Sequence, residues 1–223
     1  MSWNAFVRWL GIEPVTTSAT ERVIAALAGG MAIWVLAWIS LSWLPANASA
    51  ALVASMGASA VILFVTPHSP LAQPWPMIAG HLVAAFAGVL CAKYVQDDAV
   101  SCACAVGLTI ALMHLLRCLH PPGGGTALAV ILGSDQVHEI GFQFLVTPVA
   151  MNAVVLVLLA VVINLVFPWR RYPTALFARR AVHSEVAPTH DEILAALRKM
   201  DAFVDIAEEE LIQLIELLSK KKR

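Results

Sequence analysis

The stretch that interrupts the apolar sequence of this chain is His120-Pro121-Pro122-Gly123-Gly124-Gly125-Thr126-Ala127-Leu128. Proline lacks a backbone N–H and clashes with the preceding turn, and glycine has poor helix propensity. We therefore expect non-helical backbone from His120 to Gly125 and a helix that restarts at Thr126. Inside a membrane, irregular backbone persists only where protein buries it or where it lines a polar cavity. The break is therefore the predicted functional centre.

Composition places the chain in a membrane. Of its 223 residues, 60% are hydrophobic and 13% are charged, whereas about 25% of residues are charged in a typical soluble domain. Charged residues are sparse between Arg22 and Pro168 and dense in the tail that follows. We expect membrane lipid as a partner and no nucleic acid, because basic residues cluster only at the terminal Lys220–Arg223.

Five apolar segments approach the roughly 20 residues that cross about 30 Å of hydrocarbon. They are residues 22–44, 48–65, 77–96, 99–118 and 142–167. Residues 126–133 form a sixth, half-length piece. The expected fold class is therefore all-α: a polytopic transmembrane helix bundle with one broken, half-length helix after the His-Pro-Pro-Gly motif.

The sequence divides into three parts. In residues 1–20, the spacing of Trp3, Phe6 and Trp9 suits an interfacial amphipathic segment. Residues 21–173 form the transmembrane domain. Residues 174–223 form a short cytoplasmic helical tail with capping-box patterns at Thr189 and Asp205. Its apolar stripes are too small for an independent domain, so we expect the tail to pack on itself or on a neighbouring subunit, in a homo-oligomer.

Basic residues set the expected orientation. Arg8 and Arg22 precede the first span, and Arg170 and Arg171 follow the last. Both termini are therefore predicted to be cytoplasmic, in a multi-pass protein of the cell inner membrane. Two cytoplasmic ends require an even number of crossings, which makes the broken segment the sixth. Three spans on each side of Asp97 would form an inverted repeat, as in many secondary transporters. The alternative is an extracellular N-terminus with a purely re-entrant loop.

A half-helix that begins inside the membrane offers free N–H groups and partial positive charge, which suit an anion. The glycines Gly123–Gly125 would let the backbone approach this ligand, and Thr126 would add its hydroxyl. Gly57 and Ser59 begin a similar apolar run in the first half of the chain and would present an equivalent surface. The alternative is that the glycines allow close helix packing and the hydroxyls bond back to carbonyls.

Three further polar residues are candidates for the same site. His120 adjoins the break and could donate to an anion or accept a co-transported proton. Its alternative role is a brace for the irregular backbone. His81 lies one turn into its span and should face protein or a water path rather than lipid. Asn152 is expected to bond to the irregular backbone near the break, or to link helices.

Metal binding is not expected. The four cysteines lie in apolar spans and are interpreted as small packing residues: Cys91, Cys102, Cys104 and Cys118. Two residues apart on a helix, Cys102 and Cys104 point about 200° away from each other. His114 and Cys118 could share a face, but two ligands do not make a zinc site. We expect no metal and no other cofactor.

Three separated motifs are similar to those of the HPP family of integral membrane proteins. They are Gly57–Val61 with Ser69–Pro74, then Gly80-His81, and then His120–Leu128. The resemblance implies a polytopic membrane protein and a transporter. It also implies nitrite as the substrate, because nitrite uptake is attributed to some photosynthetic members. Some relatives carry a soluble regulatory domain at the position of this chain's short tail.

Three functions follow from these features. The first is a transporter or channel for a small inorganic anion, because the polar and irregular features gather inside the membrane; nitrite as its substrate is implied by the family resemblance alone. The second is a membrane-embedded metal-dependent enzyme using His81, His114 and His120. The acidic ligands and general bases of that chemistry are absent from the spans, so no enzyme activity is expected. The third is a scaffold or sensor that signals through the tail.

Overall fold

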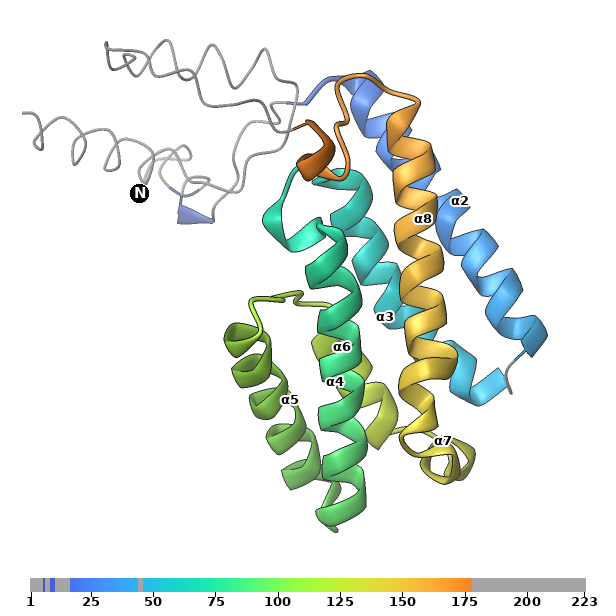
Figure 1. Ribbon diagram of the computed structural model, residues 1–223, viewed down its shortest axis with the longest axis vertical. Coiled ribbons are helices and arrows are strands. Elements are labelled where there is room, and N and C mark those ends of the chain that lie inside the picture. Colours follow the sequence, from blue (N-terminus) through green and yellow to red (C-terminus); the bar gives the residue numbers. More distant parts are fainter. Residues whose placement is uncertain (1–5, 7–8, 11–16, 44–45, 178–223) are drawn as a thin grey trace, which may run out of the picture. The chain divides into compact units, whose positions relative to one another are not determined.

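The computed structural model describes residues 6, 9–10, 17–43 and 46–177 (Figure 1). The chain separates into two compact units, residues 1–22 with 183–223 and residues 23–182. In the first unit, the rings of Phe6 and Trp9 stack with their centroids 6.1 Å apart. The predicted capping boxes at Thr189 and Asp205 lie outside the described residues, as does most of the predicted interfacial segment.

The described residues form helices and no β-strand, as the sequence predicted. The helices are α2 (Ala19–Trp43), α3 (Ala46–Val65), α4 (Pro74–Tyr94), α5 (Asp98–Leu115), α6 (Gly123–Ile131), α7 (Asp135–Ile140) and α8 (Met151–Leu165). Short turns η1 (Pro70–Ala72) and η3 (Thr174–Phe177) and the π-helical η2 (Leu145–Ala150) connect them. Four described helical segments are long and apolar enough to cross a membrane: Ala19–Ser42, Pro74–Tyr94, Asp98–Leu115 and Leu145–Leu165.

Successive long helices run in alternating directions between two ends of the bundle. The backbone after α8 returns to the start of α4, where Tyr172 donates to the carbonyl of Ala72 and Thr174 to the side chain of Gln73. We call this the η1 end. Ser40, near the last turn of α2, bonds to Asn152 at the start of α8, so these residues lie toward the opposite end. α6 and α7 follow α5 and carry the chain away from the η1 end, while the number of membrane crossings stays a prediction.

Local sequence signals explain where several of the helices begin or bend. The carboxylate of Asp97 accepts a hydrogen bond from Val100 N at 2.8 Å and caps α5. Pro74 opens α4 at its first position, where a missing N–H costs nothing. The backbone is kinked at Thr147-Pro148, where Thr147 has φ −128° and ψ 109° inside η2. The short helix α7 was not anticipated from the sequence.

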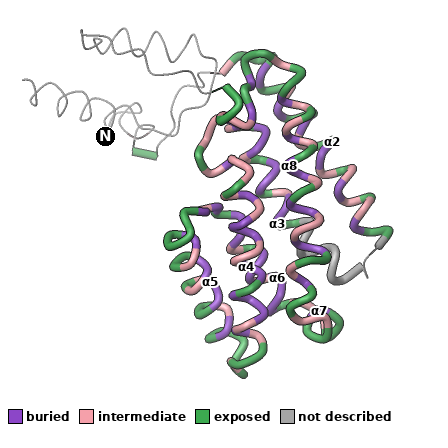
Figure 2. Tube along the Cα trace, in the orientation of Figure 1, coloured by how far each residue is buried: buried purple, intermediate pink, exposed green. Residues whose placement is uncertain are grey.

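The core lies around α4 and α6. Figure 2 shows burial concentrated along these two helices and exposed residues along the outer side of α5. α4 packs against α5, α6 and α8, and α6 also packs against α3. On α2 and α5, large apolar side chains such as Trp34, Trp38, Ile110 and Leu115 are exposed. Outward apolar faces of this kind are expected where lipid is the solvent.

A row of small residues lets α4 and α6 approach closely. Gly80, Ala84 and Gly88 are buried at four-residue intervals on α4. A Cβ atom added to Gly88 would lie 2.7 Å from the carbonyl oxygen of Ala127, so only glycine fits there without a shift of the backbone. Small residues at this spacing are typical of close helix crossings in membranes.

The proline and glycine stretch is more helical than predicted. α6 begins at Gly123, not at Thr126, and Pro122 already has helical dihedral angles. The N–H groups of Gly123, Gly124 and Gly125 donate to the carbonyls three residues earlier, at 2.9, 3.1 and 3.0 Å. Tight i to i−3 bonds of this type satisfy a helix N-terminus without a ligand. The prediction of non-helical backbone up to Gly125 was therefore wrong.

The first half of the chain also differs from expectation at Gly57. This glycine lies inside the continuous helix α3, so no helix begins there. A Cβ atom added to Gly57 would meet nothing within 4 Å. The prediction of two facing half-helix N-termini, one at Gly57 and one at Gly125, was therefore wrong, while the inverted repeat itself stays a prediction.

Candidate functional site

Polar side chains from four parts of the chain meet in the interior. Ser55 and Ser59 lie one turn apart on α3, His81 lies on α4, His120 precedes the two prolines, and Thr126 lies in the first turns of α6. All five residues are buried, and four of them have no exposed surface at all. We call these five residues the histidine–hydroxyl network.

The centre of the network is the hydroxyl of Ser59. Its Oγ lies 2.8 Å from Nε2 of His81 and 2.9 Å from Nε2 of His120. The two imidazole rings are 4.9 Å apart between centroids, at 61° to each other. A longer contact of 3.3 Å lets Ser59 donate to the carbonyl of Ser55 instead. One hydroxyl therefore connects two histidines.

Further contacts extend the network in both directions. Nδ1 of His81 lies 2.7 Å from Oγ1 of Thr126, which lies 2.7 Å from Oγ of Ser55. Ser55 also donates to the carbonyl of Pro122 at 2.9 Å. At the other side, Nδ1 of His120 donates to the carbonyl of Leu71 at 2.9 Å. Both outer partners are carbonyls, which can only accept.

The position of the network follows from helix geometry. His81 is seven residues after Pro74, so it lies about 10 Å along α4 from the η1 end at 1.5 Å per residue. Gly80 lets the segment around His120 approach this level, because a Cβ there would lie 2.7 Å from Cβ of His120. Polar groups at such depth are rare in membrane proteins and usually serve function.

The network consists of uncharged groups that can exchange the roles of hydrogen-bond donor and acceptor. Its members are imidazoles and hydroxyls, each of which both donates and accepts hydrogen bonds. None of the hydrogen bonds described above involves a carboxylate, an ammonium or a guanidinium group. Within the described residues, no three histidine, cysteine, aspartate or glutamate side chains are grouped so as to hold a metal ion. The network can donate to an anion and can pass protons between its members.

Sequence reasoning named four members of this network. Ser59, His81, His120 and Thr126 were candidates, and the fold brings them together. Ser55 was missed, although a hydroxyl one turn before Ser59 on a predicted helix was a usable signal. The carbonyl of Leu71 was also missed, because every residue has a backbone carbonyl and the sequence does not show which one accepts a hydrogen bond from a distant side chain.

The other candidate residues from the sequence lie outside the histidine–hydroxyl network. The Cβ position of Gly125 is 3.6 Å from Oγ of Ser55, whereas that of Gly124 faces open space. Gly123 packs against Met113 and the carbonyl of Gly80. Asn152 does not bond to the break as predicted, because its Oδ1 accepts from Ser40 at 3.0 Å. Its buried Nδ2 has no protein partner.

A second polar cluster fixes the η1 end. Arg170 is fully buried, and its guanidinium donates to Asn164 Oδ1 at 2.8 Å and to the carbonyl of Phe64 at 2.7 Å. Burial also raises the pKa of the Tyr172 phenol, which therefore stays protonated and donates to Ala72. Arg170 is thus a structural residue, a role that the sequence analysis did not predict when it used this arginine for the orientation of the chain.

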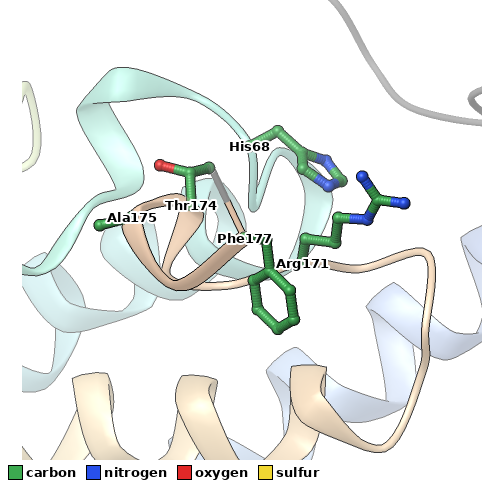
Figure 3. Close-up of a pocket in the computed structure, with 5 residues that line it drawn as sticks. All are labelled: His68, Arg171, Thr174, Ala175 and Phe177. Carbon is green, nitrogen blue, oxygen red and sulfur yellow. The ribbon is translucent and has the colours of Figure 1, made fainter. Parts of the chain in front are cut away.

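An open pocket of about 350 Å³ lies beside this cluster. Its lining residues are His68, Arg171, Thr174, Ala175 and Phe177. Figure 3 shows the His68 imidazole and the Arg171 guanidinium next to each other, with the Phe177 ring below them. The pocket contains no member of the histidine–hydroxyl network.

Comparisons with known proteins give one consistent result. A family described as "HPP, transmembrane region" matches residues 14–173. Two transmembrane proteins of Dictyostelium discoideum are similar to the chain, one 36% identical over 174 residues and the other 39% identical over 176 residues. Each alignment covers 75% of this chain but only 56% and 61% of the relatives, so the chain spans little more than half their length. No solved structure matches the chain.

Proposed function

Because the chain belongs to the HPP transmembrane family, we propose that this membrane protein transports a small inorganic anion, with nitrite as the first candidate. The observation that carries the proposal is the histidine–hydroxyl network, a buried cluster of hydrogen-bond donors among apolar helices. The anion would bind to Ser59, His81, His120 and Thr126 and cross the membrane without being chemically changed.

Neutral donors suit transport better than a fixed positive charge would. A buried ammonium or guanidinium group attracts an anion strongly in a medium of low dielectric constant and would slow its release. Hydroxyl and imidazole donors contribute a net 0.5–1.5 kcal/mol each, or about 1.5–3 kcal/mol when the acceptor is charged. Several such bonds give selective but reversible binding.

The short helix α6 supports the same proposal. It has nine residues, which at 1.5 Å per residue is about half of a membrane span. Discontinuous helices with polar residues at the interruption surround the substrate in many secondary transporters. Gly125, whose Cβ position faces Ser55, would let an anion approach the network from α6, and Gly57, Gly123 and Gly124 would allow the adjustments of α3 and α6 that admit it.

The remaining features of the proposal concern the cellular setting. We propose that the protein lies in the cell inner membrane with both termini cytoplasmic. A homo-oligomer is proposed because α2 and α5 expose apolar faces on which a second copy could pack as readily as lipid.

The test is anion flux into liposomes that contain the purified protein. Nitrite uptake above that of protein-free liposomes is expected, and competition by nitrate, formate, bicarbonate and chloride would rank the substrates. Ser59→Ala should reduce uptake at least tenfold. Ser40→Ala is the matched control, because Ser40 is equally buried but its hydroxyl bonds to Asn152, outside the network. Wild-type protein that moves none of these anions would contradict the proposal.

A further inference from the structure

We infer that the histidine–hydroxyl network takes up one proton together with the transported anion, so that the two move as a coupled pair. The inference rests on the proposed function and adds the coupling ion to it. It follows from the order of the contacts in the network and from a count of its protons.

The contacts form a single line with an acceptor at each end. The order is Leu71 carbonyl, His120, Ser59, His81, Thr126, Ser55 and Pro122 carbonyl, joined by six contacts of 2.7–2.9 Å. Each contact needs one proton between its two heavy atoms. The carbonyls at the ends contribute none.

The neutral network is one proton short. Two neutral imidazoles each carry one N–H, and three hydroxyls each carry one O–H, which gives five protons for these six contacts. Whatever the tautomers, one contact then brings two lone pairs together. An unmade hydrogen bond between buried polar groups is unfavourable by about 1–3 kcal/mol.

One added proton completes these six contacts, while the longer contact of 3.3 Å from Ser59 to the carbonyl of Ser55 is not made. With His120 charged, its two N–H groups donate to Leu71 and Ser59, and Ser59 donates to His81. The remaining donors then follow in order: His81 to Thr126, Thr126 to Ser55 and Ser55 to Pro122.

The same six contacts stay complete when the charge is on His81. Ser59 gives its hydroxyl proton to Nε2 of His81 and receives the proton of Nε2 of His120, so one O–H and one N–H break while one of each forms. The serine therefore relays the proton between the two rings, which its distances of 2.8 and 2.9 Å allow.

Apart from these two histidines, no titratable side chain contacts the network in the described residues. α7 packs against α4 and α6, and its titratable residues Asp135, His138 and Glu139 are exposed. α3 and α6 contain no charged residue, and neither does η1. On α4 the other titratable groups are Cys91, Lys93 and Tyr94, and Lys93 and Tyr94 are exposed beyond the far end of the network. On α5 and the following loop they are Asp98, Cys102, Cys104, His114, Arg117 and Cys118, of which only Cys118 is buried.

Burial explains why the proton and the anion enter together. An isolated charge inside an apolar bundle is strongly unfavourable, so the empty network stays neutral despite its missing proton. A bound anion accepts hydrogen bonds from members of the network in place of some of these internal contacts, and its charge compensates that of the imidazolium. Each ligand therefore increases the affinity for the other.

The experiment is calorimetric titration of the purified protein with nitrite in two buffers of different ionisation enthalpy. The difference in heat gives the number of protons taken up per bound anion. One proton per nitrite is expected for the wild type. In liposomes with a trapped pH indicator, the same protein should acidify the interior during nitrite uptake, after subtraction of protein-free liposomes.

Ser55→Ala is the decisive variant. Without Ser55, four groups carry four protons for the four contacts from Leu71 to Thr126, so the neutral network is complete. Proton uptake per nitrite should then fall from one toward zero, although both histidines remain. Ser55→Thr keeps the hydroxyl and should retain one proton, as should Ser40→Ala, whose serine lies outside the network.

The outcomes separate the two proposals. Nitrite binding with no proton uptake by the wild type would overturn the coupling and leave anion transport standing. Full proton uptake by Ser55→Ala would show that a histidine titrates independently of the chain of contacts, which also overturns it. If the wild type neither binds nor transports any of the tested anions, the proposed function fails first and the coupling fails with it.

Discussion

At the scale of single residues, the partners of a side chain decide its effect more than its burial does. Thr126 and Thr109 are both almost completely buried, but Thr126 contacts His81 and Ser55, whereas the Thr109 hydroxyl has no protein partner. Two otherwise similar threonines therefore have opposite expected responses to the same substitution.

Thr126→Val should destabilise the protein by about 1–3 kcal/mol, because it removes the hydroxyl that contacts Ser55 and leaves Nδ1 of the buried His81 without its partner. Thr109→Val should be neutral or stabilising, because it removes an unsatisfied buried hydroxyl. Thermal unfolding in detergent measures both. Equal effects of the two substitutions would mean that the contacts of Thr126 contribute nothing to stability.

His120→Gln keeps a side chain that can donate and accept but cannot take up a proton. Nitrite uptake by the wild type should fall as pH rises, since a proton is transported with the anion, and this dependence should flatten in His120→Gln. His138→Gln is the control, because His138 bonds to carbonyls at the end of α6, outside the network. A pH profile that is unchanged in His120→Gln would exclude this histidine as the proton carrier.

At the scale of elements, the long apolar helices could be predicted from the sequence, because hydrophobicity and length define them. The predicted segments 22–44, 48–65, 77–96 and 99–118 correspond to α2, α3, α4 and α5 within a few residues. The helical start of α6 could not be predicted, because the low helix propensity of proline and glycine is an average over many proteins that position and packing can override. Here Pro122 lies where the helix needs no N–H, and Gly123 packs closely against Met113 of α5 and against Gly80 and Ala84 of α4.

The row of small residues on α4 gives a prediction for the packing of two helices. Gly88→Ala should destabilise the protein by about 1–3 kcal/mol, because the new methyl group would overlap the backbone of Ala127. Gly107→Ala on α5 meets open space and should stabilise its helix by up to about 1 kcal/mol. Unfolding temperatures in detergent compare them, and a harmless Gly88→Ala would contradict the close contact of α4 with α6.

At the scale of the whole molecule, sequence reasoning gave the helical membrane fold and most of the candidate site. It could not give the line of contacts, because the neighbours of Ser59 come from residues more than twenty positions away and from helix packing. Of the two roles expected for Asn152, the structure shows the link between helices, through Ser40, and not a bond to the break, because the sequence does not say which neighbour a buried amide meets. The number of crossings and the orientation stay predictions.

Orientation can be tested with single cysteines in a variant that lacks the four native ones. Asp98 and Ala175 are exposed and lie near opposite ends of α4. Asp98→Cys should react with an impermeant thiol reagent in intact cells, and Ala175→Cys only after the membrane is opened. The reverse pattern would place both termini outside.

The buried guanidinium of Arg170 has a mechanical consequence. Through its bonds to Phe64 and Asn164 it joins the ends of α3 and α8, and Tyr172 joins the same place to the start of α4. These hydrogen bonds therefore hold the ends of α3 and α8 and the start of α4 together. If the helices move apart to open the interior, we expect these fixed ends to act as the hinge. The displacement of the helices then grows with distance from Arg170 and Tyr172 and is largest around α7 and the start of η2.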